Sequence, residues 1–127
     1  YEFLGNVNLF EGRVHNGVAN IGGGQIHAPE HGDVADAAAT AYVRPHELEL
    51  LPANIPHGIP ATVVRILPFG GAYRVEVSAN NGVARTLIEV DVPREQVAVL
   101  ELRPGLSVRL VARQTQLYQS ETKERVA

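Results

Sequence analysis

Hydrophobic and polar positions alternate most regularly on either side of Asn80-Asn81-Gly82. In the first run, residues 72–77, apolar side chains fall on every second position with charged residues between them, and residues 84–92 repeat the pattern. Period-two alternation is typical of a half-buried strand. Asn-Gly favours a type I′ turn, in which both central residues have positive φ. The pattern therefore predicts a β-hairpin with a type I′ turn.

Further short strands are predicted between glycine and proline breakers. Residues 59–67 are β-branched and bounded by Pro-His-Gly and Pro-Phe-Gly-Gly, and residues 106–112 alternate as a closing strand. Near the start, residues 7–14 alternate less cleanly, and the short strands there are separated by Asn16-Gly17 and by three consecutive glycines. Many short strands with such turns indicate a small all-β barrel or sandwich.

Helical structure is expected to be scarce. Residues 93–102 begin with Pro93, which is pre-organised for the first helical position, and are followed by Pro104-Gly105, so one or two helical turns are predicted there. The alanine-rich residues 35–41 are too few for a stable helix and are interpreted as a mobile loop. The polar tail 120–127 is expected to fray.

Composition narrows the class of protein. The chain has 127 residues, enough for one core or at most two small intertwined lobes. Without Trp, and with 45% hydrophobic residues, the core must be built mainly from Val, Leu, Ile and Ala. A net charge of -3 disfavours nucleic-acid binding. No run is long enough for a membrane span, and the start at Tyr1 in mid-pattern suggests a piece of a longer protein.

The histidine and glycine clusters give weak support for a metal or phosphate site. His27 and His31 have a spacing that suits two ligands on one helix, but Pro29 between them disfavours the helix, so no metal is predicted. Gly22-Gly23-Gly24 lacks the Lys-Ser/Thr of a phosphate loop and is interpreted as a turn between strands. No nucleophile motif is found either, and no catalytic residue is predicted.

Two polar segments remain as candidates. Asn6 and Asn8 alternate in a predicted strand, where they could line a ligand surface, reach across to a partner's backbone, or face solvent at an edge. The stretch "YVRPHELEL", residues 42–50, joins a cation, an imidazole and two carboxylates. Pro45 should end the strand that includes Tyr42 and Val43. Arg44 and His46 are then either anion contacts or fasteners of a turn.

Three segments carry a resemblance to a known family. "YEFLGNVNLFEGRV", "AYVRPHELEL" and "LRPGLSVRL" look like the C-terminal regulatory domain of the ATP-binding subunit of sulfate/thiosulfate ABC importers, one of the TOBE (transport-associated OB-like) barrels. Its motif residues here are Gly5, Asn6, Asn8 and Arg44-Pro45, with His46 at a position that is Glu in many importer ATPases and Glu47 next. The resemblance implies a small OB-like β-barrel with one or two helical turns.

The resemblance also implies a role. It makes residues 1–119 a single regulatory domain, or two intertwined β lobes over 1–50 and 57–119, with the ATPase domain missing upstream. The expected function is non-catalytic regulation and dimerisation in a sulfate/thiosulfate importer whose parent chain uses ATP and Mg. Expected partners are that ATPase domain, a symmetric copy and the membrane subunits, at the cytoplasmic face of the membrane without insertion into it. The alternative is an oxyanion sensor that uses Arg44 and His46.

Overall fold

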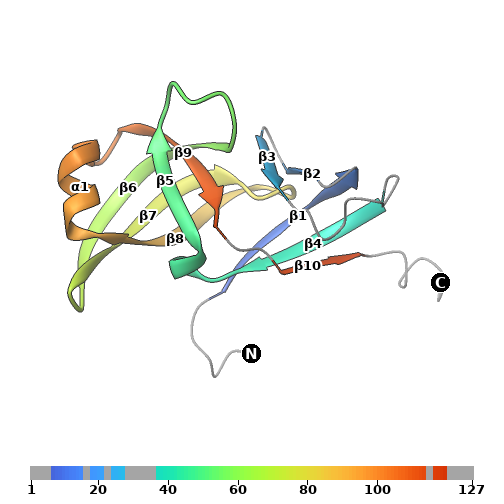
Figure 1. The fold of residues 1–127 in the computed structure, drawn as a ribbon, viewed down its shortest axis with the longest axis horizontal. Helices are drawn as coiled ribbons and strands as arrows, with labels where there is room; N and C mark the ends of the chain where they lie inside the picture. Colours follow the sequence, from blue (N-terminus) through green and yellow to red (C-terminus); the bar gives the residue numbers. More distant parts are fainter. Residues whose placement is uncertain (1–6, 16–17, 22–23, 28–36, 114–115, 120–127) are drawn as a thin grey trace.

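Most of the chain folds into ten strands in the computed structural model, which describes residues 7–15, 18–21, 24–27, 37–113 and 116–119 (Figure 1). The elements are β1 (Asn8–His15), β2 (Val18–Ile21), β3 (Gly24–His27), β4 (Ala37–Val43), the 3-10 turn η3 (Pro45–Glu47), β5 (Leu48–Pro52), β6 (Ile59–Phe69), β7 (Ala72–Asn80), β8 (Arg85–Pro93), α1 (Arg94–Leu100), β9 (Ser107–Ala112) and β10 (Gln116–Gln119). The prediction of an all-β chain with one or two helical turns is confirmed.

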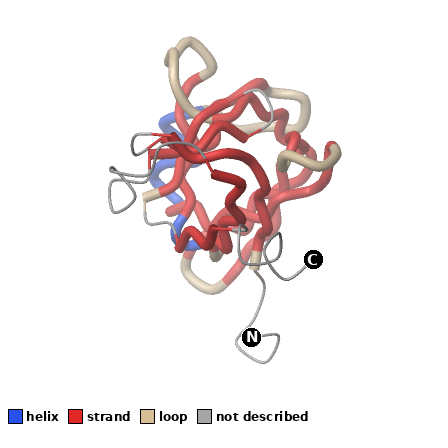
Figure 2. Tube along the Cα trace, turned by 90° about the vertical axis from the view of Figure 1, so that its right-hand side faces the viewer, coloured by secondary structure: helices blue, strands red, loops and turns tan. Residues whose placement is uncertain are grey.

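The strands form two antiparallel sheets. The first has the order β10-β4-β1-β2-β3 and the second the order β5-β9-β6-β7-β8. In the second sheet the two end strands, β5 and β8, also contact each other, so this sheet curls toward a barrel, and Figure 2 shows strands surrounding a common centre. The first sheet extends to one side of it (Figure 1).

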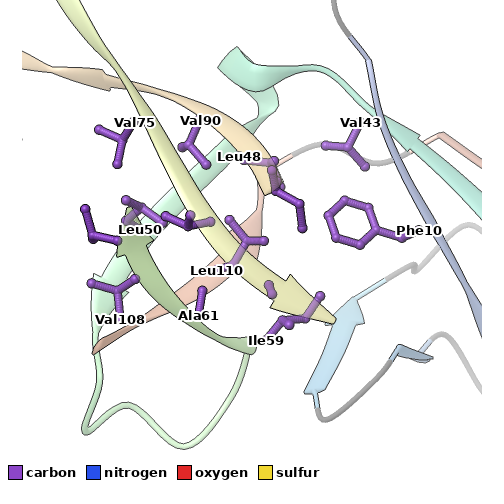
Figure 3. Close-up of a cluster of buried hydrophobic side chains, with 14 of the residues drawn as sticks. Phe10, Val43, Leu48, Leu50, Ile59, Ala61, Val75, Val90, Val108 and Leu110 are labelled. Atoms are coloured by element: carbon purple, nitrogen blue, oxygen red, sulfur yellow. The ribbon is translucent and has the colours of Figure 1, made fainter. Parts of the chain in front are cut away.

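One hydrophobic core joins the two sheets. Figure 3 shows Phe10 and Val43 of the first sheet pointing toward Leu48 and Leu110 of the second, and all four side chains are fully buried. The buried hydrophobic residues are Phe10, Ala39, Ala41, Val43, Leu48, Leu50, Ile59, Ala61, Val63, Val75, Val77, Ala79, Ile88, Val90, Val92, Leu102, Val108 and Leu110. The set is dominated by Val, Leu, Ile and Ala, as the composition predicts.

The β7–β8 hairpin confirms its strands but not its turn. The two strands pair from Ala72 opposite Pro93 to Asn80 opposite Arg85, with residues 81–84 between them. Gly82 has φ of 98°, but among the described residues Glu101 is the one non-glycine residue with positive φ. Asn81 therefore cannot belong to a type I′ turn, and that prediction is wrong. The carboxamide oxygens of Asn80 and Asn81 accept backbone N–H groups of the loop instead.

The alanine-rich segment is also different from its prediction. Residues 37–43 form β4, which pairs with β1 on one side and β10 on the other, so a mobile loop over residues 35–41 is wrong from Ala37 onward. Alanine has low strand propensity, but Ala39 and Ala41 are buried, and burial between two neighbouring strands overrides propensity. Residues 35 and 36 and the tail 120–127 lie outside the described residues.

The helix and the strands that follow it also differ in part from their predictions. The helix forms as predicted but ends at Leu100, and it is capped by Glu101, which adopts a left-handed conformation with φ of 53° three residues before Pro104. The strand predicted to close the fold, β9, lies between β5 and β6, and β10 comes after it in the chain and joins the first sheet. The local alternation identified the strand correctly but gave no information about its neighbours.

Candidate functional site at the junction of the two sheets

The segment Arg44–Glu47 carries the chain from the first sheet to the second. β4 ends at Val43, the 3-10 turn η3 begins at Pro45, and β5 begins at Leu48. Proline lacks an N–H and fixes φ, so it suits the first position of such a turn, and here it is buried. Pro45 therefore ends β4 as the sequence predicted.

Glu47 fastens this turn in three ways. Its Oε1 accepts the backbone N–H of Arg44 at 2.8 Å, and its own N–H donates to the carbonyl of Arg44 at 2.9 Å. Its carbonyl accepts the N–H of Arg113, the residue after β9, at 2.7 Å. The side chain thus satisfies a donor that the turn leaves free, as in a helix capping box. Glu47, which the sequence marked only as a motif residue, thus fastens the turn, and the choice between anion contact and fastener for Arg44 and His46 stays a prediction.

Asn8 makes the second polar link at the junction. Its Nδ2 donates to the carbonyl of Glu89 at 2.9 Å, and its Oδ1 accepts the N–H of Glu89 at 3.1 Å. Glu89 lies in β8, the last strand of the second sheet, so the carboxamide takes the place of one residue of a neighbouring strand. Asn8 is only 9% exposed, which excludes a solvent-facing edge for this residue. It reaches a backbone, as one of the three alternatives predicts, but that of its own chain.

A third link lies farther along β1. The N–H of Glu11 donates to the carbonyl of Asn81 at 2.7 Å. A Cβ added to Gly82 would lie 1.5 Å from the carbonyl oxygen of Glu11, so the loop and the strand are in close backbone contact. The links of Asn8 with Glu89, and of Glu11 with Asn81 and Gly82, are hereafter called the β1–hairpin contact. Together with η3 it fixes the first sheet against the second.

The candidate anion contacts lie on the same turn. Arg44 is partly buried and His46 is exposed. The backbone N–H of Arg44 already donates to the Oε1 atom of Glu47, so the same turn also carries a carboxylate. Gly5 and Asn6 lie outside the described residues. The structure therefore brings Asn8, Pro45 and Glu47 into one junction with Arg44 and His46, and oxyanion binding stays a prediction.

The other sequence candidates contribute little to this site. Within the described residues, no three His, Asp, Glu or Cys side chains are close enough to hold a metal ion. His31 and the first two residues of the Gly22-Gly23-Gly24 segment lie outside those residues, while Gly24 pairs with Ile21 between β3 and β2. No helix in the described part of the chain is long and apolar enough to span a bilayer.

Comparison with known families accounts for most of the chain. Residues 8–50 match the CysA C-terminal regulatory domain, and residues 53–113 match the TOBE-like domain. Residues 8–50 therefore belong to the CysA C-terminal regulatory domain family, and residues 53–113 to the TOBE-like domains. In this regulatory domain the first match covers β1 to η3 and most of β5, and the second covers β6 to β9.

Curated relatives agree with the family. The chain is 38% identical to the sulfate/thiosulfate import ATP-binding protein CysA of Nitrosomonas europaea, over 93% of this chain and 33% of that protein. It is 38% identical to the protein of the same name from a Bacillus cereus strain, over 83% of this chain and 29% of that protein. The chain thus spans about a third of the length of these relatives.

A solved structure supports the architecture. The cytoplasmic molybdate-binding protein ModG aligns with a TM-score of 0.60 over 87% of this chain and 94% of that protein, at 21% identity. At this identity the likeness concerns the fold alone. It confirms the prediction of an OB-like β fold for the regulatory domain.

Several residues that form the junction were not predicted from the sequence. Asn8 and Glu47 were among its candidates, but Glu11 and Glu89 were not, because they take part through backbone atoms that any residue could supply. Asn81-Gly82 was recognised only as a turn. The glycine at position 82 was the one available signal of the contact with β1, because glycine also allows the close approach of another strand. Local spacing in the sequence does not show whether such an approach occurs.

Proposed function

We propose that this regulatory domain is a non-catalytic part of the ATP-binding subunit of a sulfate/thiosulfate importer. The observation that carries the proposal is the similarity to import ATP-binding proteins over 93% of this chain, in a segment that makes up 33% of the relative. A segment of that size leaves room for an ATPase domain elsewhere in the parent protein. There ATP and Mg would be bound, and the membrane subunits would be contacted at the cytoplasmic face.

The contribution of this domain would be mechanical. The core, η3 and the β1–hairpin contact join two sheets into one body, which is a suitable lever or spacer between an ATPase domain and its symmetric copy. The finer proposal is that the copy packs on the outward face of the first sheet. Leu9 and Tyr42 lie directly opposite each other there, and they are 38% and 45% exposed. Most homo-oligomers close through a two-fold axis, which such a self-complementary patch suits.

Transport in the native organism tests the main proposal. Deleting the gene for the protein that contains this chain should abolish uptake of radiolabelled sulfate and thiosulfate, and an intact copy should restore it. A copy that lacks residues 8–113 should keep ATP binding but lose regulated uptake. Unchanged uptake of both anions in the deletion strain would contradict the proposal, provided that no second importer gene is expressed.

Self-association is tested separately with the complete subunit. Changing Leu9 and Tyr42 together to Glu should weaken dimers in sedimentation velocity, whereas Leu87→Glu, a change of an exposed residue on the second sheet, should not. If the unchanged subunit and both variants dimerised equally, the proposed dimer face would be wrong, but the proposed role in an importer would not be affected.

A second proposal is oxyanion binding by Arg44 and His46. It is supported by a guanidinium and an imidazole within three residues of one turn, and it is weakened by the Glu47 carboxylate, which belongs to the same turn. Calorimetry with sulfate, thiosulfate and molybdate at millimolar concentration tests it. Heat that disappears in Arg44→Gln, and persists in the distant control Arg65→Gln, would support this site. Absence of heat with all three anions would remove it.

A further inference from the structure

Asn81 and Gly82 form a chemically reactive pair. In an Asn-Gly sequence the glycine nitrogen can attack the side-chain carbonyl carbon of asparagine, because glycine has no Cβ to hinder the approach. The new N–C bond closes a succinimide, and the carboxamide nitrogen leaves as ammonia. Water then opens the ring to aspartate or isoaspartate. The balance is loss of ammonia and gain of water, so neither an oxidant nor a cofactor is needed.

The folded loop holds both reacting groups away from this path. The N–H of Gly82 donates to the Oδ1 of Asn80 at 2.7 Å, which occupies the attacking nitrogen. The Oδ1 of Asn81 accepts the N–H groups of Val83 and Ala84 at 2.9 and 3.0 Å, which fixes the carboxamide on the loop. These bonds must break before the ring can close. Reaction therefore requires the loop to open.

Opening of the loop is coupled to β1. The carbonyl of Asn81 accepts the N–H of Glu11 at 2.7 Å, and Gly82 lies so close to the Glu11 carbonyl that even a methyl group would collide with it. Rotation of the Asn81–Gly82 peptide would move both atoms of this contact. The loop can rearrange freely only when β1 has moved away from the hairpin.

We propose that Asn81 is a gated deamidation site, which reacts when the β1–hairpin contact opens and whose isoaspartyl product prevents the contact from closing again. Isoaspartate adds a methylene group to the main chain, so the carbonyl and Gly82 no longer meet Glu11 together. The product also places a new negative charge at residue 81, where the uncharged carbonyl of Asn81 accepted the Glu11 N–H. The reaction thus converts a transient opening of the β1–hairpin contact into a permanent one. This inference does not depend on the proposed transport function.

The first experiment compares deamidation in the folded and unfolded chain. The protein is incubated at mildly alkaline pH with and without concentrated urea, and isoaspartate at residue 81 is measured by peptide mapping. In urea, Asn16-Gly17 gives an internal reference, because the same dipeptide should react at a similar rate in an unfolded chain. The folded protein should react at Asn81 at least about tenfold more slowly, the factor expected for a modest local opening equilibrium. Equal rates would overturn the proposal.

The second experiment separates the loop from β1. Asn80→Ala frees the Gly82 nitrogen, and Asn8→Ala weakens the β1–hairpin contact far from the reacting atoms. Each should accelerate deamidation about two- to tenfold, the change expected from loss of one or two hydrogen bonds. Asn54→Ala, in an exposed loop, should have no effect. If Asn8→Ala perturbs the circular dichroism spectrum, Asn8→Ser, which sets no charge against the Glu89 carbonyl, replaces it. Acceleration by Asn80→Ala alone would overturn the coupling to β1.

The third experiment tests the product. Protein with isoaspartate at residue 81 is separated by ion exchange, and hydrogen exchange is measured at the Glu11 amide. Its exchange should be faster than in the unreacted protein, while amides in β6 keep their protection. Unchanged exchange at Glu11 would overturn the claim that the product holds the contact open.

Discussion

The two sheets of the regulatory domain are specified in different ways. In the second sheet, strands such as β7 and β8 alternate large buried residues with charged ones, and the end strands β5 and β8 contact each other. In the first sheet, β4 is mostly alanine, and β1 begins with an asparagine and contains a glycine. The second sheet carries its strand signal in its own sequence. The first becomes a sheet because of the neighbours against which it packs.

Because of this difference, we expect the first sheet to depend more strongly than the second on a few single contacts. Among the side chains that the structure describes, the second sheet contributes most of the large ones to the core, and the largest from the first sheet is Phe10. Beyond that ring, β1 is linked to the second sheet by the Asn8 pair and the Glu11 contact. Perturbing these few groups should therefore separate the behaviour of the two sheets.

The largest effect is expected from Phe10→Ala. The ring is fully buried between the sheets, so its removal leaves a cavity and should lower the free energy of unfolding by about 3–5 kcal/mol. Chemical denaturation followed by circular dichroism measures the change. Leu9→Ala is the matched control, because Leu9 is the adjacent residue, faces outward and is 38% exposed. It should cost less than about 1 kcal/mol. Equal losses in the two variants would contradict the placement of Phe10 in a shared core.

The same contrast explains how much could be predicted from sequence. Regular alternation identified β7 and β8, because valine and isoleucine in every second position fit a half-buried strand in any context. The alanine-rich β4 gave no such signal, since its burial comes from β1, β10 and the second sheet. At the junction, Pro45 and Glu47 could be identified from the sequence because they act on their own turn. The contacts of Glu11 and Glu89 could not be identified, because a long-range contact through backbone atoms does not require a particular side chain.

The second prediction concerns two glycines with positive φ. Gly82 lies against the Glu11 carbonyl, whereas a Cβ on Gly70 would meet nothing within 4 Å. Both Ala substitutions incur the cost of a left-handed residue, about 1–2 kcal/mol. Gly82→Ala should cost about 1–3 kcal/mol more, because the loop and β1 must move apart. Urea denaturation of the two variants gives the difference directly. A difference near zero would show that the loop does not press on β1 in solution.

The third prediction uses the Asn8 pair. Asn8→Ala leaves the N–H and carbonyl of Glu89 without the carboxamide, so a loss of about 1–3 kcal/mol is expected. Asn8→Asp keeps the acceptor but sets a carboxylate against the Glu89 carbonyl, and it should be at least as destabilising. Asn54→Ala, in an exposed loop, should stay within about 0.5 kcal/mol of the parent chain. Thermal unfolding of the three variants measures the order. A neutral Asn8→Ala would mean that water replaces the carboxamide without loss.

The smallest effect is expected where the chain crosses from one sheet to the other. Glu47→Ala removes the acceptor for the Arg44 N–H and should lower the free energy of unfolding by about 0.5–2 kcal/mol, the usual value of a helix cap. Glu47→Gln keeps an oxygen in the same place and should recover most of that loss, because the bond needs an acceptor more than a charge. Chemical denaturation of the two variants measures the difference.

If Gln were as destabilising as Ala at position 47, the negative charge would be the important property, and Glu47 would then act as the counter-ion of a cation such as Arg44. That outcome would also argue against Arg44 as an anion contact, because a carboxylate that the guanidinium requires competes with any sulfate that it could bind. The comparison of Ala with Gln therefore distinguishes a turn that merely joins two sheets from a charged cluster at their junction.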